Sequence, residues 1–75
     1  MSKKYEHYSM VIQWSEEDQV FIVTVPELPG LKTHGKTYEE AARNGQDVIE
    51  LWIDASIEWG HPIPPPKVLV SEPAS

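Results

Sequence analysis

The first half of the chain alternates between apolar and polar positions. Large apolar side chains occupy every second position from Tyr8 to Trp14, with Ser9, Val11 and Gln13 between them. This period of two predicts a β-strand, because successive strand residues face opposite sides of a sheet. A charged turn over Ser15–Gln19 separates this segment from an apolar run, Val20–Val25, and the two segments form a predicted hairpin. Pro26 ends the second strand, since it has no backbone N–H to donate. A third, shorter strand is expected over Leu31–Lys36.

The second half predicts one long helix. From Tyr38 to Trp59, apolar residues recur three or four positions apart, which is the spacing of one helix face. Thr37 and Glu40 fit a capping box, in which the threonine caps the helix and Glu40 reaches back to the Thr37 N–H. Gly60 occupies the position of a C-terminal cap.

One dipeptide inside this helix is unusual. Asn44-Gly45 commonly marks a turn, but the helical spacing continues through it. We therefore keep one helix and interpret Gly45 as a point of close backbone contact.

The chain after the helix is rich in proline. Four prolines lie between His61 and Pro66, so this segment is expected to be extended. A short last strand is expected over Lys67–Val70, followed by a frayed tail over Ser71–Ser75. The predicted order is β-β-β-α-β, an α+β fold in which one long helix packs on one face of one antiparallel sheet.

The second predicted strand is apolar on both faces. Val20 and Ile22 point to one side of it. The other side carries Phe21, Val23 and Val25. One helix covers only one face of a sheet, so we expect a homodimer or higher homo-oligomer with these five residues in its interface. The alternative is that β-propensity alone placed valines on a half-exposed strand.

Composition indicates a small folded domain that depends on association. The 75 residues include 12 acids, 6 bases and no cysteine, and the formal net charge is −6. A chain of this size buries only about 60% of the surface that its unfolded form exposes, and neither disulfides nor a Cys/His metal cluster can add stability. Nucleic-acid binding depends on lysine and arginine, so we expect no direct DNA binding.

The sequence shows no membrane span or targeting signal. Its longest apolar-rich stretch, Val20–Val25, falls far short of the ~20 residues that cross a bilayer. The two lysines near the N-terminus are not followed by an apolar region. Because the lack of cysteine is compatible with the cytosol, we expect a cytoplasmic protein without membrane contact.

Residues suited to catalysis are few. His7, His34 and His61 lie far apart and lack the spacing of a metal site. No nucleophile motif or glycine-rich phosphate loop is present. We therefore expect no enzyme activity, with no catalytic residue, cofactor-binding residue or metal ligand. The alternative from the enzyme class is a minimal nuclease or hydrolase that uses His34 with Glu39 or Glu40.

The predicted helix carries a stripe of acids without intervening bases. Its four members are spaced three, four and four residues apart and share one side of the helix: Asp47, Glu50, Asp54 and Glu58. We call these four residues the acidic stripe. Like charges at this spacing destabilise a helix by about 0.2–0.5 kcal/mol per pair. We hypothesise that the acidic stripe steers or docks a basic partner; the alternative is a solvated face of an acidic protein.

Three short motifs occur in order along the chain. They are Pro26-Glu27-Leu28-Pro29-Gly30, Gly35-Lys36-Thr37-Tyr38-Glu39-Glu40-Ala41 and Ile63-Pro64-Pro65-Pro66. With the hairpin and helix between them, they resemble the HicB-like antitoxin family from Tyr8 to Val70. The resemblance implies a truncated ribonuclease-H-like unit of order β-β-β-α-β, in agreement with the order predicted above.

This resemblance implies an antitoxin of a prokaryotic type II toxin–antitoxin system. Such a protein binds and occludes a small basic HicA-like toxin that cleaves mRNA, and the catalytic histidine belongs to the toxin. We expect the acidic stripe and the loop Glu27, Leu28 and Pro29 to contact that partner. The alternative is an orphan dimeric HicB-like module with another partner.

The sequence departs from the family pattern in two places. Many members continue after the third motif into a DNA-binding domain, whereas this sequence stops shortly after it, so we expect a single domain over residues 1–75 with an ordered core near 5–70. Lys36 stands where an acidic residue is common in the second motif.

Overall fold

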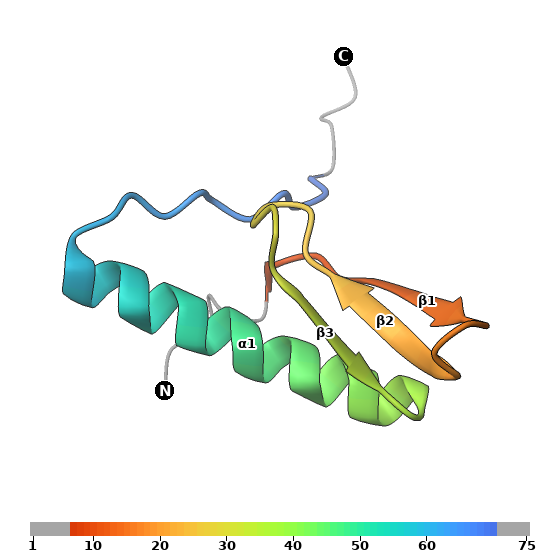
Figure 1. Ribbon diagram of the computed structural model, residues 1–75. Helices are drawn as coiled ribbons and strands as arrows, with labels where there is room; N and C mark the ends of the chain where they lie inside the picture. Colours follow the sequence, from red (N-terminus) through yellow and green to blue (C-terminus); the bar gives the residue numbers. More distant parts are fainter. Residues whose placement is uncertain (1–6, 71–75) are drawn as a thin grey trace, which may run out of the picture.

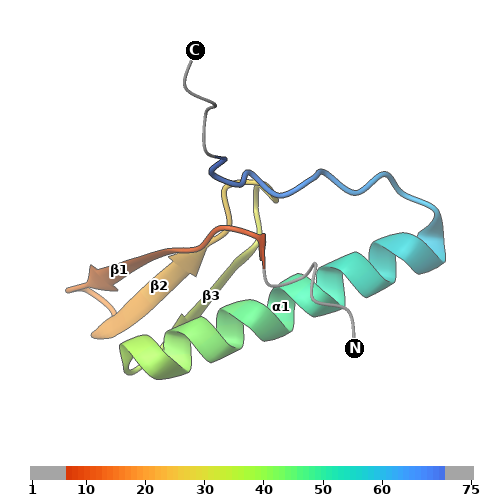
Figure 2. The same cartoon turned by 180° about the vertical axis from the view of Figure 1, so that it is seen from behind.

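A computed structural model describes residues 7–70 of the chain, which contain three antiparallel strands and one long helix (Figure 1). The strands are β1 (Val11–Ser15), β2 (Val20–Thr24) and β3 (Lys32–Gly35), and β2 lies between the other two. Helix α1 (Tyr38–Trp59) follows β3 and packs across one face of the sheet (Figure 2). The α+β class and the order of these four elements confirm the prediction.

The hairpin of β1 and β2 begins later than the alternating pattern predicted. Val11 pairs with Thr24, and Ser15 pairs with Val20. Residues 8–10 lie outside the sheet, because the Ser9 N–H donates to the side chain of Glu27 rather than to a strand. The strand therefore starts only after this competing contact.

Helix α1 begins and ends at the predicted residues. Thr37 Oγ1 accepts a hydrogen bond from the Glu40 N–H at 3.0 Å, as an N-cap does. Gly60 has a φ of +73° and forms the C-cap. The prediction for the other half of the capping box is wrong. The Glu40 carboxylate accepts a hydrogen bond from the Lys36 N–H, at 2.6 Å, and not from the Thr37 N–H. Lys36 lies just beyond β3, where its N–H has left the sheet.

Two glycines allow α1 to lie directly on the strands. A Cβ at Gly45 would lie 2.5 Å from Met10 Sδ and 3.2 Å from Val23 Cγ1, which confirms the predicted close contact. A Cβ at Gly35 would overlap the backbone of Ala41 in the first turn of α1. Side chains at either position would hold the helix away from the sheet.

The hydrophobic core lies between α1, the end of β2 and the loop after it. One cluster of its buried residues consists of Tyr8, Val25, Leu28, Ile49 and Ile53, and Val23 and Ala41 are buried as well. Four half-buried side chains pack around them: Met10, Leu31, Trp52 and Ile63. Residues from both ends of the described chain thus meet on the same helix face.

After Gly60 the chain runs back toward the sheet in an extended path (Figures 1 and 2). The Tyr8 hydroxyl donates to the Pro64 carbonyl, and the Lys67 N–H donates to a carboxylate oxygen of Glu27 at 2.7 Å. The strand predicted over Lys67–Val70 is wrong, because these residues form no ladder and the Lys67 N–H is bound by a side chain instead. The tail expected over Ser71–Ser75 lies outside the described residues.

Candidate functional site

The two faces of β2 differ in what covers them. Val23 and Val25 pack toward α1 and are 0% and 3% exposed, so they belong to the core of this chain. Phe21 lies on the same side, with its ring centroid 4.3 Å from that of Tyr38. Val20 and Ile22 lie on the opposite face, which no described element covers. Of the five residues expected in an oligomer interface, only Val20 and Ile22 lie on this open face.

Glu27 joins three separate segments of the chain. Its side chain is 4% exposed and accepts hydrogen bonds from the Ser9 N–H at 3.1 Å, the Ser9 hydroxyl at 2.9 Å and the Lys67 N–H at 2.7 Å. Burial raises the pKa of Glu27, but hydrogen bonds from the N–H groups of Lys67 and Glu27 itself and from Ser9 outweigh burial and hold that pKa below its ordinary value. We call the set of Glu27, Ser9 and Lys67 the carboxylate clasp.

The loop predicted to contact a partner is therefore largely internal. Glu27 lies in the carboxylate clasp, and Leu28 is 1% exposed in the core. Pro29 is the one residue of the three that is exposed. Among the described residues, the loop offers a partner little more than this proline.

All three sequence motifs have structural roles. The first supplies the carboxylate of Glu27, and the third supplies the Pro64 carbonyl that binds Tyr8. The second supplies Gly35 at the crossing of β3 and α1, and Thr37 at the helix cap. The motifs thus supply contacts that hold the fold together.

The acidic stripe lies on the side of α1 that faces away from the sheet. All four of its members are exposed. The buried residues of α1 are Ala41, Gly45, Ile49, Ile53 and Ser56. With 3.6 residues per turn, the acidic stripe lies opposite this buried line. The structure therefore brings the four carboxylates together on one accessible surface.

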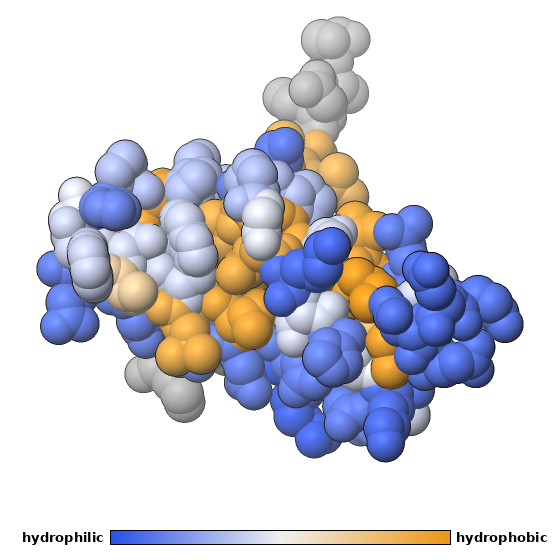
Figure 3. Space-filling view, viewed as in Figure 1, coloured by the Kyte–Doolittle hydropathy of each residue, from blue (hydrophilic) through white to orange (hydrophobic). Residues whose placement is uncertain are grey.

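Apolar side chains are exposed next to the acidic stripe. Leu51 is 68% exposed and Trp59 is 75% exposed, and Ala55 between them is also exposed. Steps of four residues place the three in one line along α1, and we call them the apolar flank. Figure 3 shows apolar surface along the helix and between it and the returning chain. An apolar line with a charged border is typical of a protein-binding surface.

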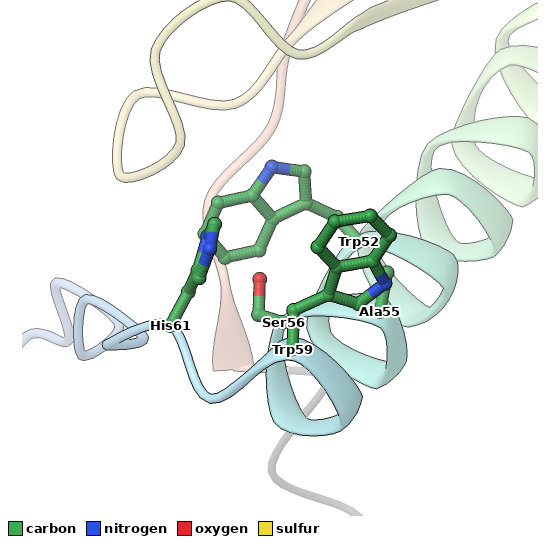
Figure 4. Close-up of a pocket in the computed structure, with 5 residues that line it drawn as sticks. All are labelled: Trp52, Ala55, Ser56, Trp59 and His61. Carbon is green, nitrogen blue, oxygen red and sulfur yellow. The ribbon is translucent and has the colours of Figure 1, made fainter.

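A hollow lined by aromatic side chains opens at the end of α1 (Figure 4). Its volume is about 290 Å³, and its lining residues are Trp52, Ala55, Ser56, Trp59 and His61. The ring centroids of Trp59 and His61 are 6.3 Å apart, and the rings are inclined at 73°. The Ser56 hydroxyl points into the space between the aromatic rings. Because Ala55 and Trp59 also belong to the apolar flank, this aromatic hollow is continuous with it.

Sequence reasoning missed the aromatic hollow. Trp52 and Trp59 fit the apolar spacing of the helix, and that spacing gives no sign that Trp59 is largely exposed. Two tryptophans seven residues apart lie two turns apart on one side of a helix. That spacing, with His61 directly after the glycine cap, is the signal that points to the hollow.

The histidines lie apart and show no metal-binding arrangement. Within residues 7–70, no group of three or more His, Cys, Asp or Glu side chains is placed to hold a metal ion. His34 is exposed on β3, and its carbonyl accepts from the Asn44 side-chain amide at 2.7 Å. Glu40, its suggested catalytic companion, accepts a hydrogen bond from the Lys36 N–H.

Within residues 7–70, no helix is long and apolar enough to span a bilayer.

Comparison with known proteins places the chain in a family. A family model described as "HicB_like antitoxin of bacterial toxin-antitoxin system" matches residues 8–74. A UPF0150 protein of Thermoplasma acidophilum is 37% identical over 57 residues, which cover 76% of this chain and 81% of that protein. A UPF0150 protein of Synechocystis is 31% identical over 68 residues, which cover 91% of this chain and 85% of that protein. No solved structure gives a significant match. The chain therefore belongs to the HicB-like antitoxin family.

Proposed function

We propose that this protein is the antitoxin of a type II toxin–antitoxin pair, and that it inhibits a small basic, HicA-like, mRNA-cleaving toxin by binding over it. Membership of the family supports an antitoxin-like role. The observation that carries the proposal is the exposed side of α1, where the acidic stripe borders the apolar flank. Inhibition of this kind is stoichiometric and takes place in the cytoplasm, where the toxin meets mRNA.

The acidic stripe supplies the attraction to a basic protein. Its carboxylates belong to a chain of net charge −6, and α1 contains a single base, Arg43. A cation 4 Å from a carboxylate gains about 1 kcal/mol in bulk water and about 4 kcal/mol near a protein surface. Charges at the border of an interface mainly raise the rate of association. We expect the acidic stripe to determine how fast the toxin is captured.

The apolar flank supplies the contact that keeps the toxin bound. Each Å² of apolar surface removed from water contributes about 25 cal/mol, and Leu51 and Trp59 expose most of their surface. Tryptophan is also among the residues that most often dominate binding energy at interfaces. In this proposal the apolar flank forms the dry centre of the interface and the acidic stripe forms its polar border.

The open face of the sheet is the proposed site of self-association. Val20 and Ile22 lie on this face, and the neighbouring β1 residue Val11 is 40% exposed. Helix α1 lies on the other side of the sheet. A second copy on the open face would therefore not cover the acidic stripe or the apolar flank.

An RNA-cleavage assay tests this function. The candidate toxin is a small basic protein sought in the neighbouring reading frame; once it is purified, its cleavage of mRNA is measured against increasing amounts of this chain. We expect the wild-type chain to stop cleavage at about one equivalent, since inhibition is stoichiometric. If the wild-type chain does not inhibit cleavage, the antitoxin role is refuted and the orphan module is favoured.

A matched pair of charge reversals tests the surface. Asp54→Lys/Glu58→Lys reverses half of the acidic stripe and should weaken inhibition by about tenfold or more. Glu16→Lys/Glu17→Lys makes the same change of charge in the exposed turn between β1 and β2, and should inhibit like the wild type. Equal inhibition by the two variants would show that α1 is not the binding surface.

A further inference from the structure

We propose that the aromatic hollow at the end of α1 binds the side chain of an arginine presented by the basic partner. The source of that arginine rests on the proposed function. The preference of the hollow for a planar cation is a property of this chain alone and is tested separately.

The lining of the hollow suits a guanidinium group. Figure 4 shows the rings of Trp52, Trp59 and His61 arranged around one open space. A guanidinium is planar, weakly hydrated and able to stack on aromatic rings, and tryptophan is the strongest partner for such contacts. A volume of about 290 Å³ leaves room for the end of one long side chain. The Ser56 hydroxyl at the floor offers an acceptor to its N–H groups.

The charge around the hollow also favours a cation. It lies at the C-terminal end of a 22-residue helix, where the backbone dipoles leave a partial negative charge. The last turn of α1 contains Glu58 and no basic residue. An anion would meet repulsion at this end of the helix, whereas a positive side chain meets attraction and aromatic rings together.

The hollow is accessible because Trp59, one of its lining side chains, is not covered by other residues. Trp59 is 75% exposed, although it stands next to the core residues of α1. Its indole approaches His61 edge to face and leaves ring surface free. A tryptophan placed between a charged border and a hollow is well positioned to anchor a partner's side chain.

Peptide titration of the full chain tests the preference for a cation. The ¹⁵N-labelled protein is titrated with a blocked Gly-Arg-Gly peptide, and the tryptophan indole signals are followed by NMR. We expect saturable shifts of the Trp52 and Trp59 indoles at millimolar peptide. Trp14 serves as the internal control, since its indole N–H donates to Glu16 in the hairpin and should not respond.

Matched peptides and variants separate the possible occupants. A citrulline peptide has the same shape without the charge and should bind at least about tenfold more weakly. Trp59→Ala should abolish the shift of the Trp52 indole, whereas Leu51→Ala, a comparably exposed residue outside the hollow, should preserve it. Equal binding of the citrulline peptide, or tighter binding of a norleucine peptide, would overturn the proposal. Shifts of the same indoles caused by protein concentration alone would assign the hollow to a second copy and overturn it as well.

The toxin assay distinguishes failure of this inference from failure of the proposed function. If the hollow receives a toxin arginine, Trp59→Ala should weaken toxin inhibition by about tenfold or more, whereas Leu51→Ala should cost less. Wild-type inhibition by Trp59→Ala would overturn the inference and leave the antitoxin role intact. Arginine binding without any inhibition of the toxin would support the cation site and overturn the antitoxin role.

Discussion

Replacing Glu27 by glutamine tests whether the carboxylate clasp secures the returning chain. The wild-type carboxylate accepts hydrogen bonds from the Ser9 N–H, the Ser9 hydroxyl and the Lys67 N–H. Glutamine has nearly the same shape, but it is neutral, and one of its two ends is a donor. At one carboxylate oxygen, this donor would face the Ser9 N–H. Glu27→Gln therefore weakens the carboxylate clasp without opening a cavity.

The expected loss of stability follows from the hydrogen bonds involved. A hydrogen bond to a charged group contributes about 1.5–3 kcal/mol, and one between neutral groups about 0.5–1.5 kcal/mol. The cheaper burial of a neutral amide offsets part of this difference, so we expect a loss of about 2 kcal/mol. The free energy of unfolding of a domain of this size is about 4–11 kcal/mol. Because the expected loss is smaller than this, Glu27→Gln should remain folded. At about 1 kcal/mol per M of urea, the unfolding midpoint should fall by about 2 M.

Acidification should remove the same contribution from the wild-type chain. The pKa of Glu27 in the folded state lies below its ordinary value of 4.5, because its hydrogen bonds outweigh the effect of burial. Its stabilisation is therefore fully present above the pKa of the unfolded chain and is lost as the pH falls through the lower pKa of the folded state. The difference in unfolding free energy between wild type and Glu27→Gln should shrink over that acidic range.

Urea titrations followed by circular dichroism, at neutral and acidic pH, measure both effects. Glu17→Gln is the matched control, because this exposed residue of the turn between β1 and β2 should leave the midpoint unchanged. Faster amide exchange at Lys67 in Glu27→Gln would locate the loss at the carboxylate clasp. Equal midpoints for wild type and Glu27→Gln at neutral pH, or a difference that grows on acidification, would refute the reasoning.

Three other substitutions test the packing and the open face. Gly35→Ala places a Cβ against the Ala41 backbone and should cost about 1–3 kcal/mol of unfolding free energy in a urea titration; an unchanged midpoint would contradict the close crossing. Thr37→Ala removes the acceptor of the Glu40 N–H and should cost about 1 kcal/mol in the same assay, whereas Thr37→Ser should cost little. Ile22→Lys places a charge on the open face and should turn a wild-type oligomer into a monomer in sedimentation velocity experiments. Identical sedimentation of the two proteins would exclude that face as the interface.

Helix α1 could be predicted to the residue because its signals are local. The Thr37 cap, the apolar spacing and the Gly60 cap all act within a few residues of the helix. The close contact at Gly45 could also be inferred, since a glycine that interrupts no periodicity usually has a packing reason. The partner of the Glu40 carboxylate was less predictable. The N–H groups of Lys36 and Thr37 are neighbours, and the path of the loop decides which of them the carboxylate reaches.

The carboxylate clasp was beyond sequence reasoning because its contacts are long-range. Ser9 and Lys67 lie 18 and 40 residues from Glu27 along the chain. A glutamate in a loop rich in proline and glycine is ordinarily exposed, which favours a partner-binding role for Glu27. The same long-range contact replaces the strand that β-branched residues predict over Lys67–Val70.

One part of the candidate site could be predicted from the sequence and the other could not. The acidic stripe could be predicted because helical spacing alone determines that its four members share one side of α1. The aromatic hollow depends on the reversal of the chain at Gly60, which places His61 against Trp59. Exposure of Trp59 depends on where the helix passes the end of the sheet, and apolar spacing does not contain that information.

The capture of a basic toxin by α1 is tested most directly by the salt dependence of the association rate. Association of the purified toxin with wild type and with Asp54→Lys/Glu58→Lys is measured by stopped-flow fluorescence at increasing ionic strength. We expect the wild-type rate constant to fall by about tenfold or more between low and high salt, since screening shortens the reach of the acidic stripe. The variant should associate more slowly and show a much flatter dependence on salt. Rate constants that are equal for the two proteins and independent of salt would contradict the proposed role of α1.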